Sequence, residues 1–222
     1  MDETGQHDTS GATLTEAEAR NRERIARRQV DKFGERREEL AAAAVATLAE
    51  QGYANTSLRD IAEHSAFSHG VLHYYFADKF ELISYCVRQY KAKCVQRYDS
   101  IVATAATADQ LLAEVGAAMT GTLRDDAAMH RLWYDLRNQS QFDERFRADV
   151  GDIDKSLEQM IWRIVSRYAE LAGRPTAVSP SLAYALADGV FQQALLAYLS
   201  DAPDALDRFG ANMRQVLPSL LG

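Results

Sequence analysis

Proline and cysteine are both scarce in this chain of 222 residues, which contains four prolines and two cysteines. The prolines all lie at or beyond residue 175, so none of them interrupts a helix before that point. Cys86 and Cys94 fall in one expected helix, where a separation of about 12 Å is too long for a disulfide. The first segment is polar and acidic, unlike a signal peptide, and we expect a cytoplasmic location.

Long apolar runs and strand-like alternation are also missing. The most apolar window, residues 182–199, contains Asp188, Gln192 and Gln193, so it predicts a buried helix and not a membrane span. Elsewhere apolar residues recur at helical spacing, and the predicted fold class is all-α. The expected helices lie near residues 34–52, 57–64, 68–75, 78–105, 108–123, 126–139, 142–172, 180–200 and 203–220.

The chain has no overall excess of basic charge, because its formal net charge is −7. The distribution is uneven: residues 20–97 carry fourteen Lys or Arg against ten Asp or Glu, and residues 98–222 carry eleven against seventeen. A basic block beside an acidic one is typical of two tasks on one chain, one of them facing phosphate. A chance fluctuation is the alternative explanation of so small an excess.

Residues 1–33 are expected to form a flexible tail and a basic arm. Thr15 and Glu18 have the spacing of a capping box, which would start a helical arm that reaches Lys32. The arm carries five arginines, at positions 20, 22, 24, 27 and 28. They either reach into a minor groove of DNA or form a solvated face, and the sequence does not choose between the two.

The most informative segment begins at Gly52, which is suited to end a helix. Asn55 and Thr56 can cap a short second helix, and residues 65–67 can turn into a third. A helix-turn-helix of this kind reads DNA with the first residues of its second helix on base edges. Residues 68–75 contain no acid, as binding to a polyanion requires.

Many spaced positions of this segment follow one pattern, which makes the motif strong. They are Gly52-Tyr53, Thr56-Ser57-Leu58-Arg59-Asp60-Ile61-Ala62, Ser68-x-Gly70-x-Leu72, Tyr75-Phe76 and Lys79-x-x-Leu82. The pattern resembles the DNA-binding signature of the TetR family of transcriptional regulators and covers roughly residues 34–82. The resemblance implies an all-α protein with an N-terminal three-helix DNA-binding domain at residues 34–80. It also implies a C-terminal helical bundle at residues 81–222 for effector binding and dimerisation.

Three positions depart from the family pattern. The turn at residues 65–67, usually Ala-Gly-Val, reads Ser-Ala-Phe, which implies a turn geometry that accepts a side chain. His73 stands where a tyrosine is usual, so the family's tyrosine-to-phosphate contact would pass to His73 itself or to Tyr74. Phe80 stands where an acid is usual.

The resemblance also implies roles in operator binding. Thr56 and Ser57 would hold phosphate at a helix N-terminus, and Lys79 would do so as a point charge. The predicted DNA-binding residues are Thr56, Ser57, Ser68, His69, Gly70, His73, Tyr74, Tyr75 and Lys79. Plainer alternatives are a helix cap at Thr56 and a solvated helix start at Lys79. A metal face at His69 and His73 lacks an obvious third ligand, and no metal site is predicted.

The resemblance implies that the last two helices form the dimer interface, and their residues agree with it. The final helix carries an apolar stripe at helical spacing, and the helix at residues 182–199 is apolar nearly all round, so it needs cover on two sides. A monomer core is the alternative explanation. The predicted interface residues are Leu182, Leu186, Gly189, Leu196, Leu206, Phe209, Met213, Val216 and Leu220.

In the TetR family the effector cavity lies among the middle helices of the C-terminal domain. Apolar side chains with a few polar anchors are typical of such a pocket. The candidates by residue type are Tyr90, Met119, Leu123, His130, Trp133, Arg137, Asn138, Phe142, Met160, Phe191 and Gln192. For each of them a place in the core or on the surface is the alternative.

The sequence therefore predicts a one-component transcriptional regulator, a repressor that binds operator DNA as a homodimer and is released by a small-molecule effector. An effector-independent or architectural DNA-binding protein is the alternative. An enzyme is not expected, because the chain has no Glu-x-x-His pair, no Gly-rich phosphate loop and no nucleophile elbow. No cofactor is predicted.

Overall fold

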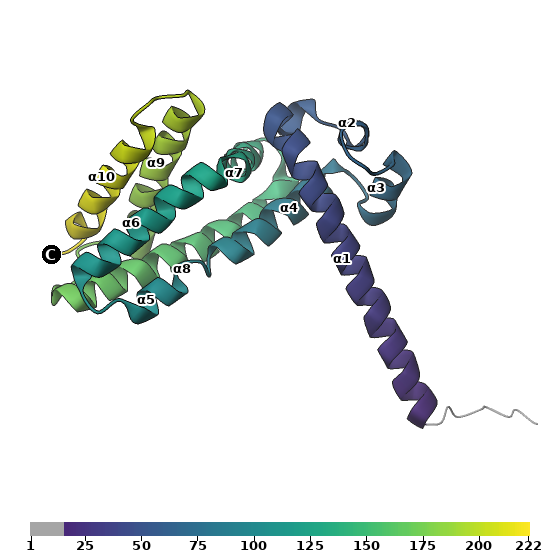
Figure 1. Cartoon of the computed structure of the whole chain (residues 1–222), viewed down its shortest axis with the longest axis horizontal. Coiled ribbons are helices and arrows are strands. Elements are labelled where there is room, and N and C mark those ends of the chain that lie inside the picture. The colour runs from purple at the N-terminus through teal and green to yellow at the C-terminus, as the bar shows by residue number, and fades with distance from the viewer. Residues whose placement is uncertain (1–15) are drawn as a thin grey trace, which may run out of the picture. The chain divides into compact units, whose positions relative to one another are not determined.

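The computed structural model describes residues 16–222, which form α-helices joined by short turns (Figure 1). No strand occurs in that range, where Thr176 and Leu221 form one isolated bridge, and the all-α prediction is confirmed. The chain divides into two compact units, residues 1–39 and 40–222. The predicted tail, and the capping box expected at Thr15, lie outside the described residues.

The first unit contains most of helix α1 (Glu16–Asn55). Its described side chains from Arg20 to Phe33 are exposed to solvent. The arm expected to reach Lys32 and the helix expected at residues 34–52 form one continuous helix through Gly34, and Gly52 alone has non-helical torsion angles within α1. A glycine inside a helix costs only about 1 kcal/mol relative to alanine, and the neighbouring Glu and Arg residues favour the helix.

In the second unit, the last turns of α1 pack with two short helices, α2 (Leu58–Glu63) and α3 (His69–Tyr75). The side chain of Ser57 caps α2, and that of Ser68 caps α3, each by accepting a hydrogen bond from the N–H group three residues later. The predicted helix-turn-helix is present, with the cap of α2 at Ser57 and not at Asn55 or Thr56. Its core is formed by Leu40, Ala44, Leu48, Leu58, Ile61, Leu72 and Phe76.

The rest of the second unit is a helical bundle in which α9 packs against α8 and α10, and α10 against α6. The bounds of its helices are α4 (Lys79–Cys94), α5 (Asp99–Thr104), α6 (Ala108–Asp125), α7 (Ala127–Gln139), the 3-10 turn η1 (Glu144–Phe146), α8 (Arg147–Ala172), α9 (Pro180–Leu199) and α10 (Ala205–Ser219). Across the described part of the chain, no helix combines the length and the apolar character that a membrane crossing requires.

Two of the expected helices are divided in the structure. The helix predicted at 78–105 breaks after Cys94, where Arg163 of α8 donates to the carbonyl oxygen of Val95 at 2.7 Å and to Asp99 at 2.9 Å. The guanidinium thus replaces a helical partner at the break. The helix predicted at 142–172 begins at Arg147, because Asp143 caps the 3-10 turn that precedes it.

The apolar stripe of α10 faces the core of its own chain, which corrects part of the predicted dimer interface. Phe209, Met213, Val216 and Leu220 are buried, and Leu206 is half-buried against the same core. These side chains are occupied by contacts with neighbouring helices, as between the rings of Phe191 and Phe209, 5.4 Å apart. A packed stripe alone does not reveal whether it meets its own chain or a partner. Leucines of α9 are exposed instead: Leu182, Leu186, Leu196 and Leu199.

The burial of Phe209 makes a stability prediction. Replacing Phe209 by Ala removes a fully buried ring and leaves a cavity, so we expect the free energy of unfolding to fall by about 3–5 kcal/mol. Urea denaturation followed by circular dichroism measures it. The matched control is Phe142→Ala, because that ring is 86% exposed and its loss should change stability by less than about 0.5 kcal/mol. Equal effects of the two changes would contradict this packing.

Candidate DNA-binding surface and effector cavity

Helix α3 presents a polar, acid-free face. Ser68, His69, Gly70 and His73 are exposed, and so is Tyr74, at 74%. The rings of His69 and His73 meet edge to face, 4.4 Å apart. Nothing lies within 4 Å of the position that a Cβ would take at Gly70, so this side of α3 is open to close approach. Tyr75 is half-buried and packs against the core. Within residues 16–222 no group of three or more His, Cys, Asp or Glu is placed to hold a metal.

The N-terminus of α2 is already occupied by a carboxylate of the chain. Asp60 accepts from the N–H of Ser57 at 2.7 Å and from its hydroxyl at 2.6 Å. Those hydrogen bonds lower the pKa of Asp60. Thr56 is buried, and its hydroxyl donates to the carbonyl of Gly52 at 2.8 Å. The structure therefore gives Thr56 an internal role in place of the predicted phosphate contact, and a phosphate at Ser57 would compete with Asp60.

The peptide groups of Tyr53 are held from two sides. The helical backbone of α1 breaks at Gly52, where φ is 75° and ψ is 169°, so the next residue needs other partners for its backbone. The N–H of Tyr53 donates to Oδ2 of Asp135 on α7 at 2.6 Å. Its carbonyl accepts from Nζ of Lys79 on α4 at 2.6 Å. One residue beside the helix-turn-helix is thus bound to two helices of the bundle.

Lys79 therefore has partners inside the protein. Its ammonium also lies over the ring of Tyr53, 4.1 Å from the centroid, a distance that suits a cation–π contact. Partial burial lowers the pKa of Lys79, an effect that the charge of Asp135 opposes. A DNA phosphate at Lys79 would have to share the ammonium with Tyr53, where this group already stabilises the end of α1.

Phe80, the residue that departs from the family pattern, belongs to the same junction. Its ring centroid lies 4.6 Å from that of the buried Phe146, which also meets the ring of Tyr53 at 5.0 Å. The guanidinium of Arg145 lies over the ring of Phe80, 5.1 Å from its centroid. An aromatic residue at position 80 thus extends the contact between the start of α4 and the segment before α8.

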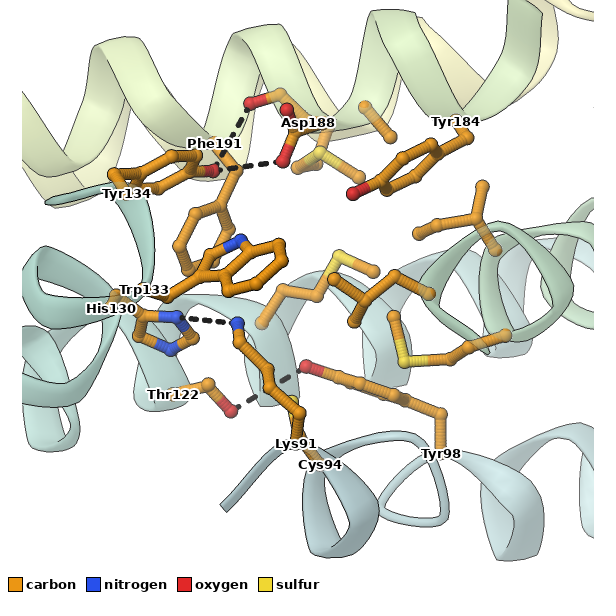
Figure 2. Close-up of a pocket in the computed structure, with 16 residues that line it drawn as sticks. Lys91, Cys94, Tyr98, Thr122, His130, Trp133, Tyr134, Tyr184, Asp188 and Phe191 are labelled. Carbon is orange, nitrogen blue, oxygen red and sulfur yellow. Dashed lines mark hydrogen bonds between the residues drawn. The ribbon is translucent and has the colours of Figure 1, made fainter. Parts of the chain in front are cut away.

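A cavity of about 60 Å³ lies inside the helical bundle (Figure 2). Every helix from α4 to α10 except α5 contributes to its wall. Most of the lining is apolar, and it includes three methionines, at 119, 160 and 213. A space of this size holds several water molecules, and flexible methionine side chains allow such a wall to adapt to other shapes.

Lys91 of α4 points into this wall, and the residue is only 5% exposed. Its Nζ lies 3.5 Å from Nδ1 of His130 and 5.2 Å from the ring centroid of Trp133 (Figure 2). The ring centroid of Tyr90 lies 5.6 Å from the same Nζ. Burial lowers the pKa of Lys91 to about 8. Burial, with the charge of Lys91 second, lowers the pKa of His130 to about 2, which keeps this imidazole neutral.

A polar network closes the side of the cavity formed by α7 and α9. Asp188 accepts from the hydroxyl of Tyr134 at 3.0 Å and from Arg137 at 2.5 Å. Arg137 also lies 3.4 Å from Asp154, which accepts from the hydroxyl of Tyr184 at 2.6 Å. Each carboxylate of this network already has a guanidinium and a phenol beside it.

The structure places the predicted effector residues in several environments. Met119, His130, Trp133, Met160 and Phe191 line the cavity, and Tyr90 lies behind it, 3.0 Å from Nε2 of His130. Arg137 sits in the adjoining network. Leu123 is core, Phe142 is on the surface, and Asn138 and Gln192 line a separate groove between α7 and α9.

Sequence reasoning missed Lys91, Tyr98, Thr122, Tyr134, Tyr184 and Asp188, which also line the cavity. One signal was present. Lys91 interrupts an otherwise apolar stripe of α4, formed by Ile83, Val87 and Cys94 at helical spacing. A lysine in such a stripe must be buried with its charge, which marks a position of interest.

Gly52 provides a direct test of the Tyr53 junction. An added Cβ would meet Oδ2 of Asp135 at 3.2 Å, and the torsion angles suit glycine almost alone. We expect Gly52→Ala to lower the free energy of unfolding by about 1–3 kcal/mol. The control is Gly151→Ala in α8, where nothing lies within 4 Å of the added Cβ and alanine should stabilise by up to about 1 kcal/mol. Thermal and urea denaturation measure the free energy of unfolding of both variants. An unchanged free energy of unfolding in Gly52→Ala would rule out the strained junction.

Comparison with known proteins agrees with this architecture. Residues 40–86 match the model for bacterial regulatory proteins of the tetR family. No curated protein matches the chain by sequence. Among solved structures, the chain is similar to the transcriptional regulator FadR from Bacillus subtilis in complex with stearoyl-CoA. Identity is 20% and the TM-score 0.65, over 81% of this chain and 96% of that one.

Two further structures have the same fold. The ketosteroid transcriptional regulator KstR2 of Mycobacterium tuberculosis is 23% identical, with a TM-score of 0.64 over 84% of this chain and 95% of that one. A regulator from Saccharomonospora viridis in complex with choline is 18% identical, with a TM-score of 0.68 over 85% of this chain and 98% of that one. Residues 40–86 thus match the helix-turn-helix segment of the tetR family, and the chain shares its fold with these solved transcriptional regulators.

Proposed function

We propose that this protein is a repressor that binds operator DNA as a homodimer in the cytoplasm and leaves it when a small molecule enters the cavity. It acts by binding and not by catalysis. Residues 34–80 bind DNA, and residues 81–222 bind the effector and form the dimer. The observation that carries the proposal is that α4 and α7, which line the cavity with Lys91 and Trp133, also hold the Tyr53 peptide.

The exposed face of α3 is the proposed reading surface. Ser68, His69, His73 and Tyr74 project hydroxyl and imidazole groups, which can donate to or accept from base edges. Gly70 leaves room for close approach of the backbone. This set omits Thr56, which is buried, and gives Lys79 and Tyr75 positioning roles beneath the surface.

Coupling between effector and DNA follows from the same contacts. Trp133 and Tyr134 line the cavity, and the next residue of α7, Asp135, binds the N–H of Tyr53. Lys91 lies twelve residues after Lys79 on α4, or about 18 Å along the helix. A ligand that fits only one arrangement of α4 and α7 shifts the population toward that arrangement. The helix-turn-helix then moves with Tyr53, and affinity for DNA falls by the differential binding energy.

The exposed leucines of α9 support the homodimer. Leu182, Leu186 and Leu196 are 56%, 41% and 67% exposed and lie on one helical face, which Gly189 shares. The opposite face of α9, with Ala183, Tyr184, Ala187 and Leu195, belongs to the core. Contiguous exposed apolar surface is typical of an interaction site, and a second copy of the same face satisfies the two-fold symmetry of a dimer.

Selection of bound genomic fragments by the purified protein tests the DNA-binding proposal. We expect enrichment of a pseudo-palindromic site, and Tyr74→Ala should weaken binding to that site at least tenfold without lowering the melting temperature. The matched control is Phe142→Ala, which removes another exposed aromatic ring. Fluorescence anisotropy with a labelled fragment measures both. Absence of any enriched site would refute specific recognition, and unchanged binding by Tyr74→Ala would remove α3 from it.

The dimer makes a separate prediction. Leu196→Glu places a charge on the exposed face of α9 and should shift the mass in light scattering from two chains toward one at micromolar concentration. Since the side chain is 67% exposed, the fold of each chain should survive, as circular dichroism can verify. Phe142→Glu is the control and should leave the mass unchanged. A light-scattering mass of one chain for the wild-type protein would refute the dimer.

A further inference from the structure

The cavity wall contains a buried cation without an anion. Among the side chains that the structure describes, no carboxylate oxygen lies within 4 Å of the ammonium of Lys91, which is almost completely buried. Buried lysines are normally paired with an acid. The partners recorded for this one are Nδ1 of His130 at 3.5 Å and the faces of two aromatic rings.

The nearby carboxylates are committed to other cations. Asp188 and Asp154 share Arg137, and Asp126 pairs with Arg97 at 2.8 Å. The thiol of Cys94 has a pKa raised by burial, so it stays neutral. His130 uses Nδ1 toward Lys91 and Nε2 toward the hydroxyl of Tyr90 at 3.0 Å. None of these groups supplies the negative charge that Lys91 lacks.

The surroundings of Lys91 also define the rest of the occupant. Trp133, Phe191, Met119 and Met160 provide an apolar wall. Among the described residues the indole N–H of Trp133 is a buried donor without an acceptor, and such a group costs free energy until it is satisfied. The hydroxyl of Tyr98 lies 3.5 Å from that of Thr122, on the same side as Lys91 (Figure 2).

We propose that the effector of this cavity is an organic monoanion, a carboxylate on an apolar body, whose charged group pairs with Lys91. This inference rests on the proposed function and names the chemical class of its effector. A single ammonium suits a single compact charge, because an ion pair in a buried site is favourable only when charges and hydrogen bonds are both satisfied. A polyphosphate would need several cations, and Lys91 is the charged donor of this lining.

The small resting volume restricts the body of the acid. About 60 Å³ is too little for a large ligand, so the methionine side chains at 119, 160 and 213 must repack around the occupant. Slender or flat bodies require the least repacking. Medium-chain aliphatic acids and small aryl acids are therefore suitable probes.

Isothermal titration calorimetry on the full chain compares octanoate with octanamide, and phenylacetate with phenylacetamide. Each pair has the same shape and differs in charge. We expect the acid of at least one pair to bind ten or more times more tightly than its amide, and octylammonium not to bind. Equal affinities within both pairs, preferential binding of the amides, or no binding by any acid would overturn the proposal.

Two variants on α4 test whether Lys91 is the group that binds the carboxylate. Lys91→Met keeps the length and apolar fill of the side chain while removing its charge, so it should abolish the preference for the acid. Lys93→Met is the matched control, because Lys93 is exposed on the same helix; it should keep the preference. If Lys91→Met does not fold, the comparison of acid and amide on the native chain still decides.

Anisotropy with the selected DNA fragment separates this inference from the proposed function. Loss of DNA binding on addition of the acid supports both. Binding of the acid without release of DNA leaves the effector class standing and refutes the proposed response. DNA binding with no preference for either acid refutes the effector class and leaves the DNA-binding proposal intact.

Discussion

The two hydrogen bonds to the Tyr53 peptide are the constraint on which the arrangement of this protein depends. Gly52 takes torsion angles that stop the α1 ladder, and the freed groups are taken by Asp135 of α7 and Lys79 of α4. Each of these side chains carries charge, and charge-assisted hydrogen bonds are about twice as strong as neutral ones. The end of α1 is therefore fixed to the bundle by two short, directional contacts and by the rings of Phe80 and Phe146.

Both anchoring helices also form the cavity wall, and the proposed response to a ligand depends on this double role. A closely packed core switches between discrete arrangements and does not deform continuously. A small shift at one site therefore becomes a discrete rearrangement at another. A displacement of α7 that accommodates a ligand at Trp133 carries Asp135 with it, since the two side chains are two residues apart on one rigid helix. The Tyr53 peptide then follows Asp135 or loses its partner.

The sequence predicted the parts of this structure that depend on local chemistry. Helical spacing, the break at Gly52 and the turn at residues 65–67 are set within a few residues, and the helix-turn-helix was found on that basis. The cap of α2 was expected at Asn55 or Thr56 and lies at Ser57. Tertiary contacts decided the rest. The break after Cys94 needs Arg163 from α8, and Thr56 could not be recognised as internal before its hydroxyl was seen to bind Gly52. The α10 stripe was assigned to a dimer because periodicity shows a buried face and not what buries it.

Helix α9 connects the two sites that the proposed mechanism must link. On one face Asp188 and Phe191 border the cavity, and on the other Leu182, Leu186 and Leu196 form the exposed apolar surface. Asp188 is bound to Arg137 and Tyr134 of α7, so α7 and α9 move together unless that network breaks. In the proposed dimer, a shift of α7 would reach the partner through α9 and the reading head through Asp135. To bind DNA, the two recognition helices of a dimer must lie about one helical turn of DNA apart. In the proposed mechanism, the network that joins the cavity, the partner and Tyr53 alters this spacing without any direct contact between effector and DNA.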